Sequence, residues 1–143
     1  MILLDTNVIS DPARPAPNLA VRAWLDAQPS ASLFLCAPVL GELRFGVERL
    51  PDGARKRRLQ SAADQIEYDL YRGRILSFDA NAASQYGRVA AARERVGRPM
   101  GQMDALIASI ALAHRAALAT RDVEGFSDLG LELINPFQAP APR

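Results

Sequence analysis

MILLDTNVIS, residues 1–10, is the stretch that decides the fold class. It opens on an uninterrupted apolar run, residues 1–4, which is typical of a strand buried on both faces. The polar residues Asp5, Thr6 and Asn7 follow at once. Strands covered on both faces occur in sheets that lie between layers of helices. The stretch therefore predicts an α/β domain whose first strand ends in polar groups.

The rest of the chain alternates short apolar runs with longer segments of helical periodicity. We expect further strands at residues 33–36, 75–78, 117–120 and 131–134. We expect helices at residues 19–27, 38–50, 54–71 and 79–96, and one that begins near residue 102. The prolines Pro12, Pro15 and Pro17 make residues 10–18 a predicted loop. The alternation predicts a mainly parallel sheet, in which ligands bind at the carboxyl ends of the strands.

The composition is that of an ordinary globular domain, and we expect one domain over residues 1–143 with a loose proline-rich tail from about residue 136. The formal net charge of +1 argues against a strongly basic protein that wraps nucleic acid.

No apolar run approaches the length of a membrane span, and no basic region precedes Asp5, so we expect a cytoplasmic protein without membrane contact. Cys36 lies in the apolar run 33–36, which predicts a buried, reduced thiol.

Four acidic residues occupy positions that the predicted fold brings together. Asp5 ends the first strand and Asp122 follows the strand at 117–120, so both should leave the sheet at the same edge. Glu42 and Asp104 lie early in predicted helices, where the helix dipole and free backbone N–H groups favour negative charge. We therefore expect all four carboxylates in one crevice.

Such a cluster favours a divalent cation. Two carboxylates 4 Å apart repel by about 4 kcal/mol at an effective dielectric near 20. Oxygen ligands select Mg²⁺ or Mn²⁺ over zinc, and neither Cys nor the distant His114 belongs to the set. Each acid also has a simpler explanation, as a strand end, a solvated helix residue, a helix N-terminal charge or a turn former. The apolar neighbours of Asp5 and Asp104 count against these explanations, because unpaired carboxylates are seldom buried.

The segments that carry these acids also carry a family resemblance over nearly the whole chain. They are MILLDTNVIS, GELRFGVERL around Glu42, MDALIASIALAH with Asp104, and LATRDVEGF leading into LELINPF. In this order they resemble the PIN-domain ribonucleases, specifically the VapC-type toxins of bacterial toxin-antitoxin pairs, including the FitB-like branch.

The resemblance implies a three-layer α/β/α domain and an endoribonuclease that depends on Mg²⁺ or Mn²⁺ and hydrolyses RNA with metal-activated water. It implies metal-binding and catalytic roles for the four acids and supporting roles for Thr6 and Thr120. The implied partners are the RNA substrate and a cognate antitoxin, whose C-terminal segment would pack near Glu42 and insert a basic side chain among the acids. A homodimer and a larger toxin-antitoxin complex are also implied.

One motif departs from the common family pattern. Many relatives have Asn where Asp122 stands and an acid where Gly125 stands. This departure leaves open a catalytically inactive PIN-fold module that only binds or regulates. A phosphatase of another α/β fold is a weaker alternative, because Asn7 stands where its second Asp would be expected.

Two groups of basic residues have two open interpretations, contact with RNA phosphates or a solvated helix face. They are the run at residues 55–58 and the set Arg93, Arg95 and Arg98.

Overall fold

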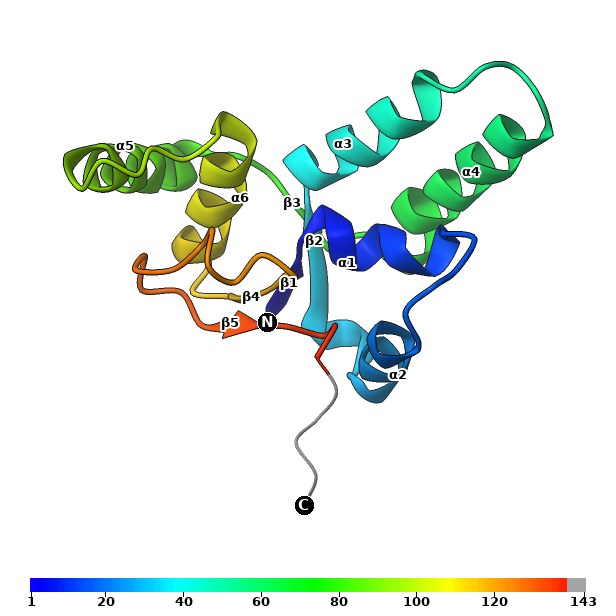
Figure 1. Ribbon diagram of the computed structural model, residues 1–143, viewed down its shortest axis with the longest axis horizontal. Helices are drawn as coiled ribbons and strands as arrows, with labels where there is room; N and C mark the ends of the chain where they lie inside the picture. The colour runs from blue at the N-terminus through cyan, green and yellow to red at the C-terminus, as the bar shows by residue number, and fades with distance from the viewer. Residues whose placement is uncertain (139–143) are drawn as a thin grey trace.

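The computed structural model describes residues 1–138. Its centre is a five-stranded sheet in the order β3-β2-β1-β4-β5, in which every strand pair is parallel (Figure 1). The strands are β1 (Ile2–Leu4), β2 (Leu33–Cys36), β3 (Ile75–Leu76), β4 (Ala117–Ala119) and β5 (Leu133–Ile134). In β1, Leu3 lies opposite Phe34 of β2 and Leu118 of β4. The predicted parallel sheet is confirmed.

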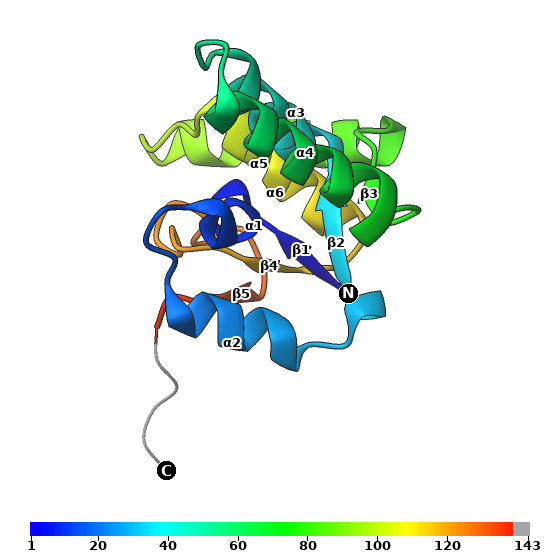
Figure 2. The same cartoon turned by 90° about the vertical axis from the view of Figure 1, so that its right-hand side faces the viewer.

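Helices cover both faces of this sheet. Figure 2 shows α2 on one side of the strands and α3 to α6 on the other. The α-helices are α1 (Thr6–Ser10), α2 (Leu19–Ala27), α3 (Ala37–Glu48), α4 (Ala54–Gln65), α5 (Ala80–Arg95) and α6 (Gln102–Ala113). Short helical turns are η1 (Asp11–Ala13), η2 (Ser30–Ser32) and the π-helical η3 (Ile66–Leu70). The three-layer α/β/α arrangement agrees with the expectation from the sequence.

The core lies on both faces of the central strands, and much of it lies between these strands and α6. Leu3 of β1 and Leu118 of β4 are fully buried, as are Ile107 and Ile110 of α6. The apolar strands meet the expectation of burial on both faces, because helices flank the sheet on each side. The core therefore holds the ends of β1 and β4 and the start of α6 in fixed relative positions.

The segment after β1 differs from the predicted loop. Residues 6–10 form α1, and Asp5 caps this helix by accepting a hydrogen bond from the Thr6 backbone N–H at 2.7 Å. Pro12 lies in η1, beyond the end of α1, so it does not interrupt α1. Part of the predicted loop at 10–18 is therefore helical, and Asp5 is both the end of a strand and the start of a helix.

The described part of the C-terminal segment is packed against the fold. Pro136 is buried, and Phe137 packs against the hydrophobic core with the Arg121 guanidinium 4.0 Å from its ring centre. The chain is thus held as far as Phe137, and residues 139–143 of the expected tail lie outside the described residues. Within residues 1–138, no helix has the length and apolar character needed to cross a membrane.

Candidate acidic site

The four predicted acids lie on or directly after strands and helices that end or begin at the carboxyl edge of the sheet. Asp5 directly follows β1, and Asp122 follows the neighbouring strand β4 after two residues. Glu42 lies on α3, the helix that continues directly from β2, and Asp104 is in the first turn of α6. The strand order therefore places β1 between β2 and β4, so that the elements carrying the acids meet at one edge, as the sequence predicts.

Asp5 is held by neutral donors. Its side chain is buried, and one carboxylate oxygen accepts the Thr6 N–H. The other oxygen accepts the Thr120 hydroxyl at 2.7 Å and the Asn7 side-chain amide at 3.2 Å. These hydrogen bonds fix the position of the carboxylate without supplying a positive charge. The predicted supporting residues Thr6 and Thr120 both contact Asp5.

Glu42 is tied to the same network through Thr6. The Thr6 hydroxyl donates to a Glu42 carboxylate oxygen at 2.6 Å, while its backbone N–H donates to Asp5. Asn7 has a comparable double role, because its side-chain oxygen accepts the Arg121 backbone N–H at 3.1 Å. We did not identify Asn7 as a site residue from the sequence. Its position two residues after Asp5, in the polar group that ends β1, was the available signal.

Electrostatic effects on Asp104 show that the acids share one environment. The pKa of Asp104 is raised, first by burial and then by the negative charges of Asp5, Asp122 and Glu42. The Cys36 thiol, buried at the end of β2, also responds to this environment. Burial is the main cause that raises the pKa of Cys36 to about 12, and the charges of Asp5 and Glu42 add to it. Asp5, Glu42 and Asp122 therefore lie close enough to Asp104 to act on its carboxylate.

The Asp122 carboxylate is directed to its own loop. Its backbone N–H donates to the Thr120 hydroxyl at 3.0 Å, and one carboxylate oxygen accepts the Gly125 N–H at 3.0 Å. A Cβ atom on residue 125 would lie 2.1 Å from the other carboxylate oxygen. The glycine at this position therefore leaves the space that the Asp122 side chain occupies.

The donor set fits a hard divalent cation in its chemistry. All of its side-chain groups are carboxylates, and within residues 1–138 none of the four forms an ion pair with a Lys, Arg or His side chain. The carboxylates are not drawn together into a ligand set, however. In the described part of the chain, no group of three or more His, Cys, Asp or Glu side chains has a metal-binding arrangement. Mutual repulsion of the acids favours such separation.

A groove of about 440 Å³ begins at the acidic site and runs between α1, α3 and α4. Thr6 and Glu42 line one part of it. Much of the remaining lining is apolar, and it includes Ile9, Leu43, Val47, Leu59, Ala63 and Ile66. Three exposed arginines also line the groove, namely Arg14, Arg55 and Arg58. The groove thus combines an acidic part, an apolar lining and basic side chains.

Of Arg93, Arg95 and Arg98, Arg93 fits neither of the two open interpretations, RNA contact or solvated face. Arg93 is 7% exposed, and its guanidinium donates to the backbone oxygens of Arg98, Gly125 and Ser127. The interpretation of Arg93 as an RNA contact is therefore wrong. Arg95 is exposed, and Arg98 is exposed with a loose ion pair of 3.7 Å to Asp128.

Comparison with known proteins identifies the family. The model of the PIN domain matches residues 2–131. VapC ribonuclease Y4jK of Sinorhizobium fredii is 40% identical over 96% of this chain and 99% of its own length. Toxin FitB of Neisseria gonorrhoeae is 39% identical over 96% of this chain and 99% of its own length. The solved structure of FitAB bound to a DNA fragment aligns with a TM-score of 0.92 and 38% identity, covering 97% of each chain. The chain therefore belongs to the PIN domain family, in the branch that includes VapC ribonucleases and FitB.

Proposed function

We propose that this chain is a metal-dependent endoribonuclease and the toxin of a toxin-antitoxin pair. The observation that carries the proposal is the shared site of Asp5, Glu42, Asp104 and Asp122, where Asp104 responds to the other three charges. The similarity to VapC ribonuclease Y4jK and to toxin FitB supports both the activity and the biological role. A cytoplasmic, single-domain protein that acts on RNA follows from the same proposal.

The proposal gives separate roles to the residues of the site. Asp5, Glu42, Asp104 and Asp122 would hold Mg²⁺ or Mn²⁺, with Asp5 fixed in advance by Thr6, Asn7 and Thr120. When bound, a divalent cation supplies positive charge for the scissile phosphate and lowers the pKa of a water molecule.

No side chain is required as a nucleophile. The half-buried position of Asp104 limits solvent around its carboxylate, and this strengthens its attraction for a cation. The proposal therefore assigns binding and orientation to the protein and the positive charge to the cation.

The first test replaces a carboxylate that we propose as a metal ligand by the neutral amide of asparagine, which has nearly the same volume. We expect Asp5→Asn and Asp104→Asn each to lower Mn²⁺-stimulated RNA cleavage at least 100-fold, because each removes a charged ligand. Asp69→Asn is the matched control, because Asp69 is an exposed carboxylate on η3. Circular dichroism would verify that the variants are folded. Cleavage at the wild-type rate by either site variant would contradict the assignment.

The alternative is a PIN-fold module that binds without cutting, motivated by the altered pattern at Asp122 and Gly125. Calorimetric titration with Mn²⁺ and a cleavage assay on the same sample separate the two functions. Binding of Mn²⁺ and RNA with no cleavage by the wild-type chain would favour the module.

An antitoxin is the partner that we propose for the groove beside the acids. FitAB, a solved relative, supports such a complex. The apolar lining suits an amphipathic segment, and Glu42 at one part of the groove suits a basic side chain. A homodimer of this chain, and its assembly with the antitoxin into a larger complex, belong to the same proposal. Copurification with the product of a small neighbouring reading frame, followed by mass measurement of the complex, would test it.

A further inference from the structure

Arg93 is a buried cation surrounded by backbone oxygens. It lies in the last turn of α5, and its guanidinium donates from Nε to the Arg98 oxygen at 2.9 Å. From Nη1 it donates to the oxygens of Gly125 and Ser127, each at 3.2 Å. Within residues 1–138 it forms no ion pair with a carboxylate. A buried guanidinium is costly unless hydrogen bonds replace its hydration, so these carbonyl groups are essential to its position.

The carbonyl groups that Arg93 binds belong to two loops. The loop at residues 96–101 joins α5 to α6, and α6 carries Asp104 in its first turn. The Arg98 backbone N–H also donates back to the Arg93 oxygen at 2.9 Å, so this loop is held twice. The loop at residues 120–132 joins β4 to β5 and carries Asp122. The Arg93 side chain therefore links the loop that precedes Asp104 to the loop that carries Asp122.

A continuous series of hydrogen bonds runs from Arg93 to Asp5. The Gly125 residue accepts from Arg93 through its oxygen and donates to the Asp122 carboxylate through its N–H. The Asp122 N–H then donates to the Thr120 hydroxyl, which donates to Asp5. The Gly125 backbone thus connects the Arg93 guanidinium, bound at its oxygen, to the Asp122 carboxylate, bound at its N–H.

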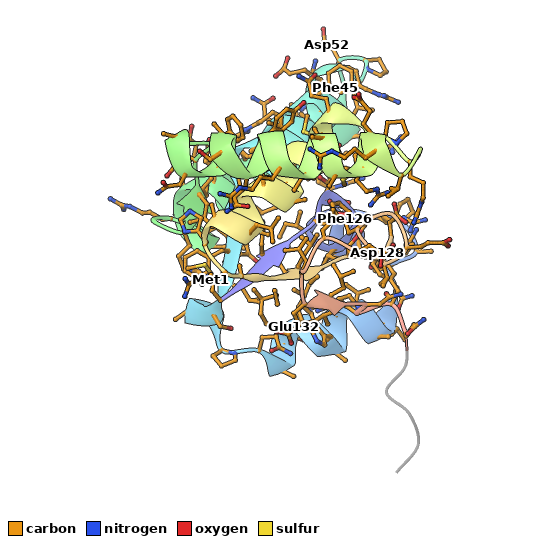
Figure 3. The ribbon with its side chains drawn as sticks, turned by 90° about the vertical axis from the view of Figure 1, so that its left-hand side faces the viewer. Met1, Phe45, Asp52, Phe126, Asp128 and Glu132 are labelled. Atoms are coloured by element: carbon orange, nitrogen blue, oxygen red, sulfur yellow. The ribbon has the colours of Figure 1, made fainter. Side chains whose placement is uncertain are left out.

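The loop has a second anchor, Phe126, next to Gly125. Phe126 is 1% exposed and belongs to the hydrophobic core, and Figure 3 shows it beneath α5 on the side of the strands. Phe126 anchors the loop in the hydrophobic core, whereas Asp122 is exposed. Gly125 lies between the two residues in the sequence, and the Arg93 side chain binds its backbone oxygen.

We propose that Arg93 is a positioning residue, which fixes the Gly125 backbone and, through the Gly125 N–H, the direction of the Asp122 carboxylate. The role as a metal ligand that this gives Asp122 rests on the proposed function. Arginine suits the task because its planar fork reaches carbonyl groups in two directions, whereas lysine is a point donor. Arg93 acts through Asp122 and contacts neither the metal nor RNA.

The test compares Arg93→Met and Arg93→Lys with Arg95→Met, the control on the exposed face of the same helical turn. Hydrogen exchange of the metal-free protein, read by NMR at the amides of Asp122 and Gly125, measures the loop directly. We expect at least tenfold faster exchange in Arg93→Met, a smaller increase in Arg93→Lys and no change in Arg95→Met. Arg93→Lys keeps the positive charge, and we expect it to fold even if Arg93→Met does not.

The second measurement is the Mn²⁺ dissociation constant, determined by calorimetry at a temperature well below unfolding. We expect Arg93→Met to raise it about tenfold, in the range typical for the loss of a group that orients a metal ligand. In an Asp122→Asn background, the same substitution should have no further effect, because the residue through which Arg93 acts has been altered.

The outcomes separate this proposal from the proposed function. If Arg93→Met lowers only the melting temperature and leaves the two amides unchanged, Arg93 is a structural residue and the proposal is overturned. An undiminished effect on Mn²⁺ affinity in the Asp122→Asn background overturns it as well. If the wild-type chain binds no Mn²⁺, the proposed function fails, and the exchange rates of the metal-free variants still decide whether Arg93 positions the loop.

Discussion

Gly125→Ala places a single methyl group against the Asp122 carboxylate. The added carbon would lie 2.1 Å from one carboxylate oxygen, 2.6 Å from the carboxyl carbon and 2.9 Å from the other oxygen. Carbon and oxygen atoms at ordinary contact are more than 3 Å apart, so the carboxylate must move by about 1 Å or more. The backbone of Gly125 is not in the left-handed region, so alanine adds no strain of its own.

The displacement should affect stability slightly and cation binding strongly. Loss of the hydrogen bond from Gly125 to the exposed Asp122 costs about 1 kcal/mol, equivalent to a fall of about 3 °C in melting temperature. If Asp122 is a ligand, the dissociation constant for Mn²⁺ should rise about tenfold or more.

Differential scanning calorimetry and titration calorimetry measure these two effects. Gly87→Ala is the control, because Gly87 lies inside α5 with open space around the added carbon. Alanine there should stabilise the protein by about 0.5–1 kcal/mol without changing Mn²⁺ affinity. An unchanged Mn²⁺ affinity in Gly125→Ala would refute the reasoning, since it would mean that the direction of the Asp122 carboxylate has no part in binding.

Two further predictions concern Thr120 and Asp104. Thr120→Val keeps the shape of the fully buried side chain but removes the donor to Asp5, and it should lower the free energy of unfolding by about 1–3 kcal/mol in urea titrations. Thr120→Ser should recover most of that loss, and equal stability of all three proteins would contradict the role of the hydroxyl. Because the folded-state pKa of Asp104 is raised, its charge destabilises the metal-free fold at neutral pH, and this effect is relieved as pH falls through that pKa. Asp104→Asn should therefore raise the melting temperature in EDTA at pH 7 but by less near pH 4, and a gain independent of pH would argue against this cause.

The fold was largely predictable because its strands are local apolar runs. Residues 1–4 and 33–36 signal buried strands without any knowledge of their partners. The helix α1 was missed because it has only five residues and lies close to the first of several prolines. Short helices depend on caps and tertiary packing more than on periodicity, and here the cap is Asp5.

The placement of the acids, with Thr6 and Thr120 beside Asp5, was predictable from the sequence, whereas the contacts of Asn7 and Arg93 were not. The positions of Asp5 and Asp122 follow from strand ends, since neighbouring parallel strands end at one edge. Two of the backbone oxygens that bind Arg93 lie more than 30 residues away in the loop after β4, and no local pattern reports such a contact. For the same reason Arg93 looked like part of an exposed basic set, and only the packing of α5 against the rest of the fold shows that it is buried.

The central place of β1 in the sheet has a consequence for protein synthesis. The ribosome makes Thr120, whose hydroxyl holds Asp5, 115 positions after Asp5 itself. Strand β1 also gains its second neighbour only when β4 is available. A nascent chain consequently lacks a complete acidic site until nearly all of the domain has left the ribosome. The order of the strands thus delays assembly of the proposed site until β4 and the residues that follow it have been made.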